Sequence, residues 1–78
     1  MNYKNIPHPV LKAAKHLINH YGERLVLIGS YANQEVYVFS FPDDVETGFP
    51  FLYLLDEKKQ TAREITGSET LDLIGKLQ

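Results

Sequence analysis

Hydrophobic positions in the first quarter of the chain recur at the spacing of one helical face. From Pro9 to Tyr21 the apolar side chains fall three and four residues apart, as on an amphipathic helix. These positions are Val10, Leu11, Ala14, Leu17, Ile18 and Tyr21. Pro9 suits the first helical turn, and Gly22 suits the left-handed position that follows a helix. The pattern predicts one helix over residues 9–21.

Three short apolar runs follow, and all are rich in β-branched and aromatic residues. They are Leu25 to Ile28, Val36 to Phe41 and Phe51 to Leu55. Runs of this length and composition are typical of strands. Ala32-Asn33 lies between the first two runs, and because Asn tolerates a positive φ, we expect an antiparallel hairpin there. Residues 42–50 combine prolines, a glycine and acids, which predicts a loop that projects from the sheet.

The last part of the chain predicts a polar edge strand and a short helix. Gln60 to Ile65 is weakly patterned and polar, as edge strands are. Thr66 to Glu69 has the form of a capping box, and an apolar stripe follows at Leu71, Ile74 and Leu77. The element order is therefore α-β-β-β-β-α. We expect an α+β fold with a four-stranded antiparallel sheet, most simply a meander, in a single small globular domain spanning residues 1–78.

The strands carry apolar side chains on both faces of the predicted sheet. Val36 and Val38 share one face, while Tyr37 and Phe39 share the other. Since two short helices can cover about one face of four strands, we expect a partner to cover the other face. The predicted interaction surface comprises Tyr37, Phe39, Phe41, Phe51, Tyr53, Leu25 and Leu27. The alternative is a strongly curled sheet with helices on both faces, which would hide these side chains within one chain.

The run Leu25 to Ile28 adds a second reason to expect a partner. In a plain meander it forms an edge strand, yet it carries no charge that would deter pairing with another strand. The leading hypothesis is therefore a non-enzymatic protein-interaction module that homodimerises or binds another protein.

Composition narrows the class of protein further. The chain has no cysteine, so it needs no oxidising compartment, and together with the absence of an apolar signal or membrane segment this favours the cytoplasm. The net charge is −2, and Val36 to Phe41 contains no Lys or Arg to hold a phosphate backbone. We expect neither nucleic acid nor a membrane as a partner.

Two groups of polar residues offer the alternative of metal or small-ligand binding, although we expect no cofactor. His16 and His20 are four residues apart on a helix, the spacing at which two imidazoles reach one metal ion. The acidic loop from Asp43 to Glu46 holds three carboxylates. It matches the EF-hand pattern at Asp43 and at Gly48, and the other ligand positions of that pattern are not matched. Neither group has the acid, base or nucleophile arrangement of an enzyme, so no catalytic residue is predicted.

Gln34 and Val36 match two positions of the Q-x-V-x-G hairpin motif. A helix followed by a meander is similar in coarse topology to the cystatin-like folds in which that motif occurs. Val38 stands where the motif has its glycine, so the inhibitory hairpin is absent and no family is assigned.

Overall fold

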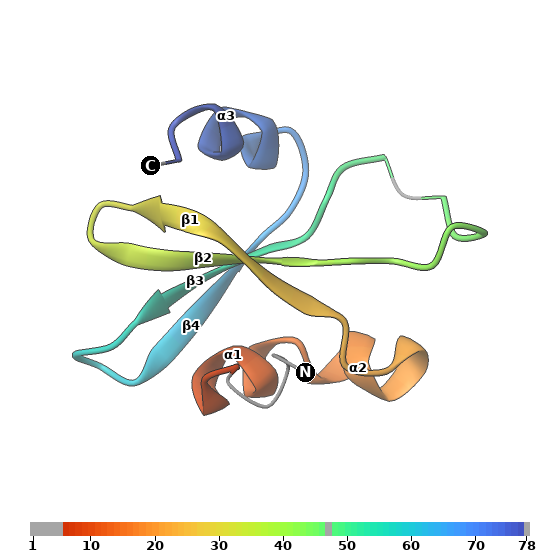
Figure 1. Cartoon of the computed structure of the whole chain (residues 1–78), viewed down its shortest axis with the longest axis horizontal. Coiled ribbons are helices and arrows are strands. Elements are labelled where there is room, and N and C mark those ends of the chain that lie inside the picture. Colours follow the sequence, from red (N-terminus) through yellow and green to blue (C-terminus); the bar gives the residue numbers. More distant parts are fainter. Residues whose placement is uncertain (1–5, 47, 78) are drawn as a thin grey trace.

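Four consecutive strands form one antiparallel sheet in the computed structural model, which describes residues 6–46 and 48–77. The strands are β1 (Leu25–Tyr31), β2 (Gln34–Phe39), β3 (Leu52–Asp56) and β4 (Thr61–Ile65). They lie in the sheet in chain order, so the predicted meander is confirmed. The architecture is α+β, as the sequence predicts. Two helices precede the four strands in the chain and a third helix follows them (Figure 1).

The predicted first helix is divided into two helices. They are α1 (His8–Ala13) and α2 (Lys15–Tyr21), and the helical conformation is interrupted at Ala14, where φ is −94° and ψ is 10°. The apolar stripe itself is confirmed, because all six of its side chains are buried in or packed against one core cluster. The break lets each short helix follow the twisted sheet separately: α1 contacts β3 and β4, whereas Tyr21 of α2 packs on Phe39 of β2.

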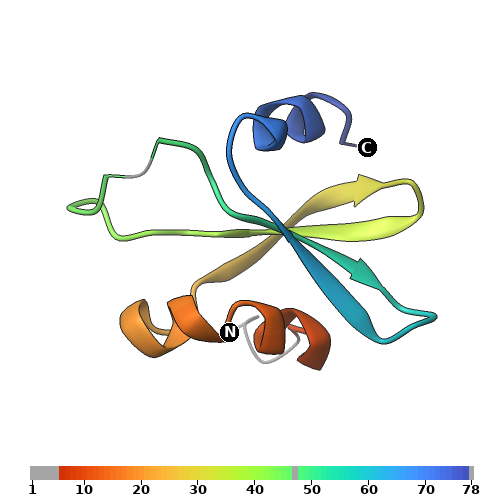
Figure 2. The ribbon, with the colours of Figure 1, turned by 180° about the vertical axis from the view of Figure 1, so that it is seen from behind.

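The helices cover both faces of the sheet (Figures 1 and 2). On one face, α1 and α2 bury a cluster that includes Val10, Phe39 and Tyr53. On the opposite face, α3 (Glu69–Gly75) packs on Val36 and Leu54. The expectation of a sheet with one face left open is therefore wrong, and the curled arrangement with divided helices is the one observed. The right-handed twist of the sheet makes room for a helix on each side.

The last helix packs with a different face from the predicted one. Its sheet-facing residues are Thr70 and Leu73, whereas Leu71 and Ile74 of the predicted stripe are exposed. Ser68 makes no side-chain cap bond, and the hydroxyl of Thr70 instead donates a 2.7 Å hydrogen bond to the carbonyl oxygen of Gly67. That bond satisfies a fully buried hydroxyl, which would otherwise oppose burial of this face.

The two-residue hairpin between β1 and β2 has the predicted geometry. Ala32 and Asn33 both have positive φ, 52° and 65°, as a type I′ turn requires. The longer connection between β2 and β3 projects beyond the sheet, as predicted (Figure 1). Its base is held by edge-to-face contacts of Phe41 with Phe39 and Phe51, whose ring centroids lie 5.0 and 5.4 Å from that of Phe41.

Candidate interaction surface

Strand β1 forms one edge of the sheet and exposes apolar side chains. Val26 is 46% exposed, Leu27 51% and Ile28 37%, although these are aliphatic residues in the middle of a strand. Residues that alternate along a strand point to opposite faces, so Val26 lies on the α3 side and Leu27 on the α1 side. Both flanks of this edge are therefore apolar and accessible.

The backbone of β1 also has hydrogen-bonding groups that β2 does not use. Leu25 lies opposite Phe39, but the N–H of Phe39 donates to the carbonyl of Phe51, the residue before β3, at 3.0 Å. In an antiparallel ladder such a residue pair is not hydrogen-bonded, so the N–H and C=O of Leu25 point away from β2. Leu27 follows two residues later in unbroken register and has the same orientation. The edge thus offers two donors and two acceptors to an added strand.

The regular part of β1 is the segment Leu25–Leu27, and a distinct feature bounds it at each end. The N–H of Ser40 donates to the carbonyl of Arg24 at 2.7 Å, and Nε of Arg24 donates to the carbonyl of Ser40 at 2.6 Å, which fixes the start of the strand. At the other end the register shifts between Leu27 and Gly29, so Ile28 is an inserted bulge residue. Gly29 has a φ of 153°, which a glycine adopts easily. The segment Leu25–Leu27 is therefore the regular part of the edge.

The opposite edge of the sheet has a different chemical character. Strand β4 exposes Thr61, Arg63 and Glu64, and α1 packs against it. Charged side chains on an edge strand deter pairing with another chain, and a covering helix has the same effect. The described residues show no comparable protection on the outer side of β1. The two edges therefore differ: the β4 edge is polar and charged, whereas the β1 edge is apolar and exposed.

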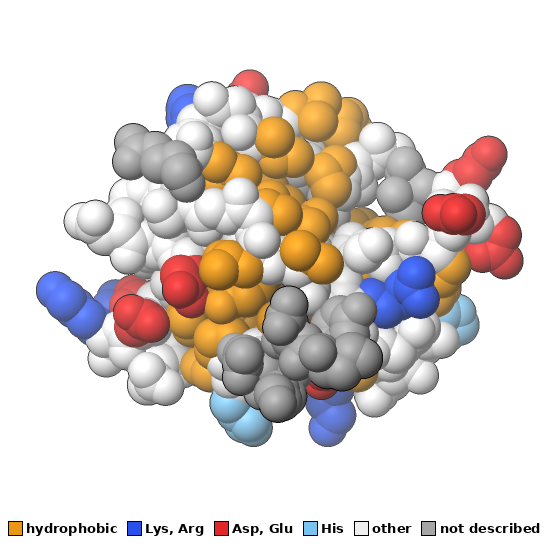
Figure 3. Space-filling model, viewed as in Figure 1, with side chains coloured by type: hydrophobic (Ala, Val, Ile, Leu, Met, Phe, Trp, Pro, Cys, Tyr) orange, Lys and Arg blue, Asp and Glu red, His pale blue; other side chains and the backbone are white. Residues whose placement is uncertain are grey.

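Helix α3 extends the apolar surface beside β1. Leu71 is 54% exposed and Ile74 41%, whereas Leu73, which faces the sheet, is 8% exposed. The view of Figure 3, in which β1 lies nearest the reader, shows hydrophobic side chains gathered over α3 and across β1. We call this surface the edge patch. It comprises Val26, Leu27 and Ile28 of β1 with Leu71 and Ile74 of α3.

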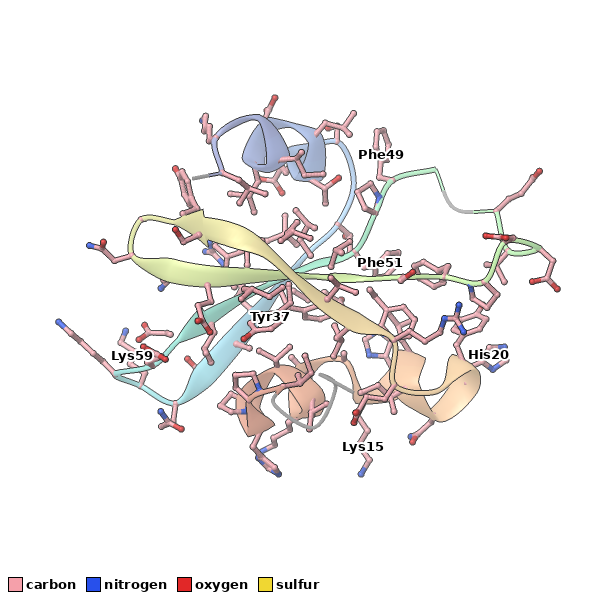
Figure 4. All side chains as sticks on the ribbon, in the orientation of Figure 1. Lys15, His20, Tyr37, Phe49, Phe51 and Lys59 are labelled. Atoms are coloured by element: carbon pink, nitrogen blue, oxygen red, sulfur yellow. The ribbon has the colours of Figure 1, made fainter. Side chains whose placement is uncertain are left out.

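Most side chains of the predicted interaction surface lie inside the protein. Leu25, Tyr37, Phe39 and Tyr53 belong to the buried core beneath α1 and α2, and Figure 4 shows Tyr37 on that side of the sheet. Phe41 and Phe51 are partly buried and pack against the same core. Leu27 is the member that the structure places on the edge patch. The aromatic side chains are thus held by the chain's own helices.

The two buried tyrosines are hydrogen-bonded to carboxylates at the core boundary. The hydroxyl of Tyr37 donates to Oε1 of Glu35 at 2.8 Å, and that of Tyr53 donates to Oε2 of Glu64 at 2.6 Å. Burial raises the pKa of both phenols well above the usual value, and the neighbouring carboxylates raise it further. Both bonds stabilise neutral, protonated tyrosines, which is a structural role rather than that of a general base.

The histidines of α2 do not converge on a common ligand. Nε2 of His16 lies 3.1 Å from Oε2 of Glu64, whereas the ring of His20 stacks edge-on against Tyr21 with centroids 4.5 Å apart. Among the described residues no group of three His, Asp or Glu side chains is arranged to hold a metal ion. Of the loop carboxylates, Asp43 borders a shallow hollow whose other walls include Phe39, Phe41 and Phe49. Neither predicted alternative site has the geometry of a closed metal centre.

Leu71 and Ile74 are the edge-patch residues that sequence analysis did not assign to the surface, whereas Val26 and Ile28 lie within the run Leu25 to Ile28 that it identified as an unprotected edge. One signal for α3 was present in the sequence. Its apolar residues at positions 71, 73, 74 and 77 spread over roughly 160° of a helix, which is wider than one strand-facing stripe needs.

No helix in the described part of the chain has both the length and the apolar character needed to cross a bilayer. Comparison with known proteins adds no assignment, since no family model, curated protein or solved structure matches the chain.

Proposed function

We propose that this chain is a non-enzymatic protein-interaction domain that accepts an extended strand along β1. The observation that carries the proposal is the combination of outward backbone groups at Leu25 and Leu27 with exposed apolar side chains on both flanks. Main-chain hydrogen bonds supply affinity in strand addition, and side chains on alternate faces supply selectivity. The partner is a second copy or another protein, and we place the interaction in the cytoplasm because the cysteine-free chain requires no oxidising compartment.

The apolar side chains favour a protein strand over a small polar ligand. Burying a Val or Leu side chain contributes about 1.5–3 kcal/mol when it goes from full exposure to full burial, and roughly half of that remains available at Val26 and Leu27. Leu71 and Ile74 widen the surface on the α3 side. A strand that pairs with β1 can cover Val26 and Leu27 at once, because it also has two faces.

Titration with a strand-forming peptide tests the proposal. A synthetic peptide with the sequence Leu25–Tyr31, flanked by lysines for solubility, is added to the ¹⁵N-labelled chain and followed by NMR. We expect amide shifts concentrated at residues 25–28, with smaller shifts in α3. Leu27→Lys should abolish them because a charge on the edge opposes pairing, whereas Thr61→Lys on the opposite edge should leave them unchanged.

Two outcomes would overturn the proposal. One is the absence of any shift at saturating peptide, and the other is an equal response in wild type and Leu27→Lys. Shifts centred on His16 and His20, or on residues 43–46, in a separate titration with zinc or calcium would instead favour the ligand-binding alternative.

A further inference from the structure

We infer that the strand added at β1 is β1 of a second copy, antiparallel to the first, with Val26 on the two-fold axis. This inference rests on the proposed function and specifies its partner. In this register Leu25 stands opposite Leu27 of the second copy, Val26 opposite Val26, and Leu27 opposite Leu25. The two sheets then join into one sheet of eight strands.

The backbone geometry selects this register. Leu25 and Leu27 both direct their N–H and C=O groups outward, and they are two residues apart within the regular part of β1. When Leu25 pairs with Leu27 of the second copy across a two-fold axis, the outward N–H and C=O groups of the two residues face each other. This happens once on each side of Val26. Each such pair exchanges two hydrogen bonds, so the dimer gains four. A register centred on Leu27 would run the pairing into the bulge at Ile28.

The side chains are self-complementary in the same register. Residues opposite one another share a face, so the two Val26 side chains meet on the α3 side. Leu27 stands opposite Leu25 of the second copy on the α1 side, where Leu25 itself is covered by its own helices. Arg24 stands opposite Ile28 of the second copy, and no two like charges face each other. A hollow lined by Glu23, Arg24, Val26 and Ser40 lies beside this position and leaves room for an apolar side chain.

Helix α3 contributes the rest of the contact area. Glu69, Asp72 and Lys76 border a hollow whose walls also include Arg63 and Ile65 of β4 and Tyr31 at the end of β1. Ile74 lies about 160–200° around the helix from Asp72 and Lys76, on the flank away from that hollow, and the hydrophobic surface over α3 continues onto β1 in Figure 3. A two-fold axis perpendicular to the sheet brings both copies of α3 to the same face. Their exposed Ile74 and Leu71 side chains then border the joint.

The size of the contact indicates a dimer of moderate affinity. A standard interface buries about 800 Å² per partner, and that is roughly 15% of the 5378 Å² accessible surface of this chain. Three half-exposed side chains of β1 supply only part of this area, so the contribution of α3 is required. We expect a dimer that dissociates on dilution.

Cysteine cross-linking tests the register, because the chain has no cysteine of its own. In Val26→Cys the two sulfurs would meet across the axis in a pair that is not hydrogen-bonded, where the Cα atoms of facing residues lie about 4.5 Å apart, close enough for a disulfide. We expect a covalent dimer to form at least about tenfold faster than with Thr61→Cys, because pairing raises the effective thiol concentration. Leu27→Cys should be slower than Val26→Cys. Sedimentation should show a dimer for the wild type and a monomer for Leu27→Lys.

The outcomes separate this inference from the proposed function. A wild-type chain that stays monomeric up to millimolar concentration overturns the inference, and so does cross-linking that is fastest at position 27 or 61. If the strand peptide still binds to β1 in that case, the proposed function survives with another protein as the partner. If the peptide also fails to bind, both fail. Val26 is half-exposed, so the cysteine variant should fold, and sedimentation of the wild type decides the matter if it does not.

Discussion

Tyr53 and Glu64 face each other across β3 and β4, and the tyrosine hydroxyl donates a 2.6 Å hydrogen bond to the glutamate. Tyr53 is fully buried, while Glu64 lies at the surface and its Oε2 is also 3.1 Å from Nε2 of His16 in α2. The pair therefore links the centre of the core to the helix that covers it. The equivalent contact of Tyr37 with Glu35 lies on the same side of the sheet.

The first prediction concerns stability at alkaline pH. The folded-state pKa of Tyr37 and Tyr53 is raised above the ordinary value near 10, so unfolded tyrosines lose their protons first as the pH rises. Their contribution is fully present below about pH 10 and is lost above it. Each tyrosine lowers the free energy of unfolding by at most about 1.4 kcal/mol per pH unit, and solvent around the part-buried hydroxyls reduces this value.

Urea unfolding of wild type and Tyr53→Phe at about pH 8 and pH 11 measures the effect. The variant should be less stable by about 1 kcal/mol at the lower pH, where it lacks one hydrogen bond. It should lose less stability than the wild type between the two pH values. An identical loss in both proteins would contradict the raised pKa of Tyr53.

The second prediction concerns the hairpin between β1 and β2. Ala32 has a φ of 52°, and a non-glycine residue in this left-handed region costs roughly 1–2 kcal/mol. Changing Ala32-Asn33 to Asn-Gly supplies the residues that a type I′ turn prefers. We expect the free energy of unfolding to rise by about 1 kcal/mol in chemical denaturation. A decrease would show that the turn is not of this type in solution.

Much of the fold could be predicted because periodicity reports local structure directly. The 3.6-residue spacing of Val10, Ala14 and Leu17 reveals a helix and its buried face. The same pattern does not predict that the helix is interrupted at Ala14, because alanine has a high helix propensity. The break accommodates the twist of the sheet, and that sheet is formed by residues far from Ala14 in the sequence.

The candidate site was harder to predict. Periodicity shows which side of a helix is apolar, but it does not show which face of the sheet that helix covers. Tyr37 and Phe39 look like contact residues when one face is assumed open, yet α1 and α2 bury them. In β1 the sequence does indicate an unprotected apolar edge, and the structure places Leu27 there. The apolar stripe alone does not show which side of α3 packs inward, because the polar Thr70 faces the sheet and its hydroxyl is satisfied locally by the carbonyl of Gly67.

The third prediction compares two glycines that both have open space around the position of a Cβ atom. Gly22 ends α2 with a φ of 94°, which is strained for any side chain. Gly75 is the last residue of α3 and has no such φ. We expect Gly22→Ala to lower the free energy of unfolding by about 1–2 kcal/mol, and Gly75→Ala to raise it by up to about 1 kcal/mol. Changes of the same sign would show that packing, not backbone conformation, dominates at one of the sites.

The last prediction separates the two sides of α3. Leu73 is buried against the sheet, so Leu73→Ala should cost about 2 kcal/mol or more in thermal or chemical unfolding. Ile74 is on the edge patch and 41% exposed, so Ile74→Ser should lower the stability of the monomer by only about 1 kcal/mol. Because Ile74 borders the proposed dimer joint, the same variant should weaken self-association in sedimentation. Ile74→Ser with wild-type self-association would remove α3 from the interface, and the β1 edge alone would then have to hold the two copies together.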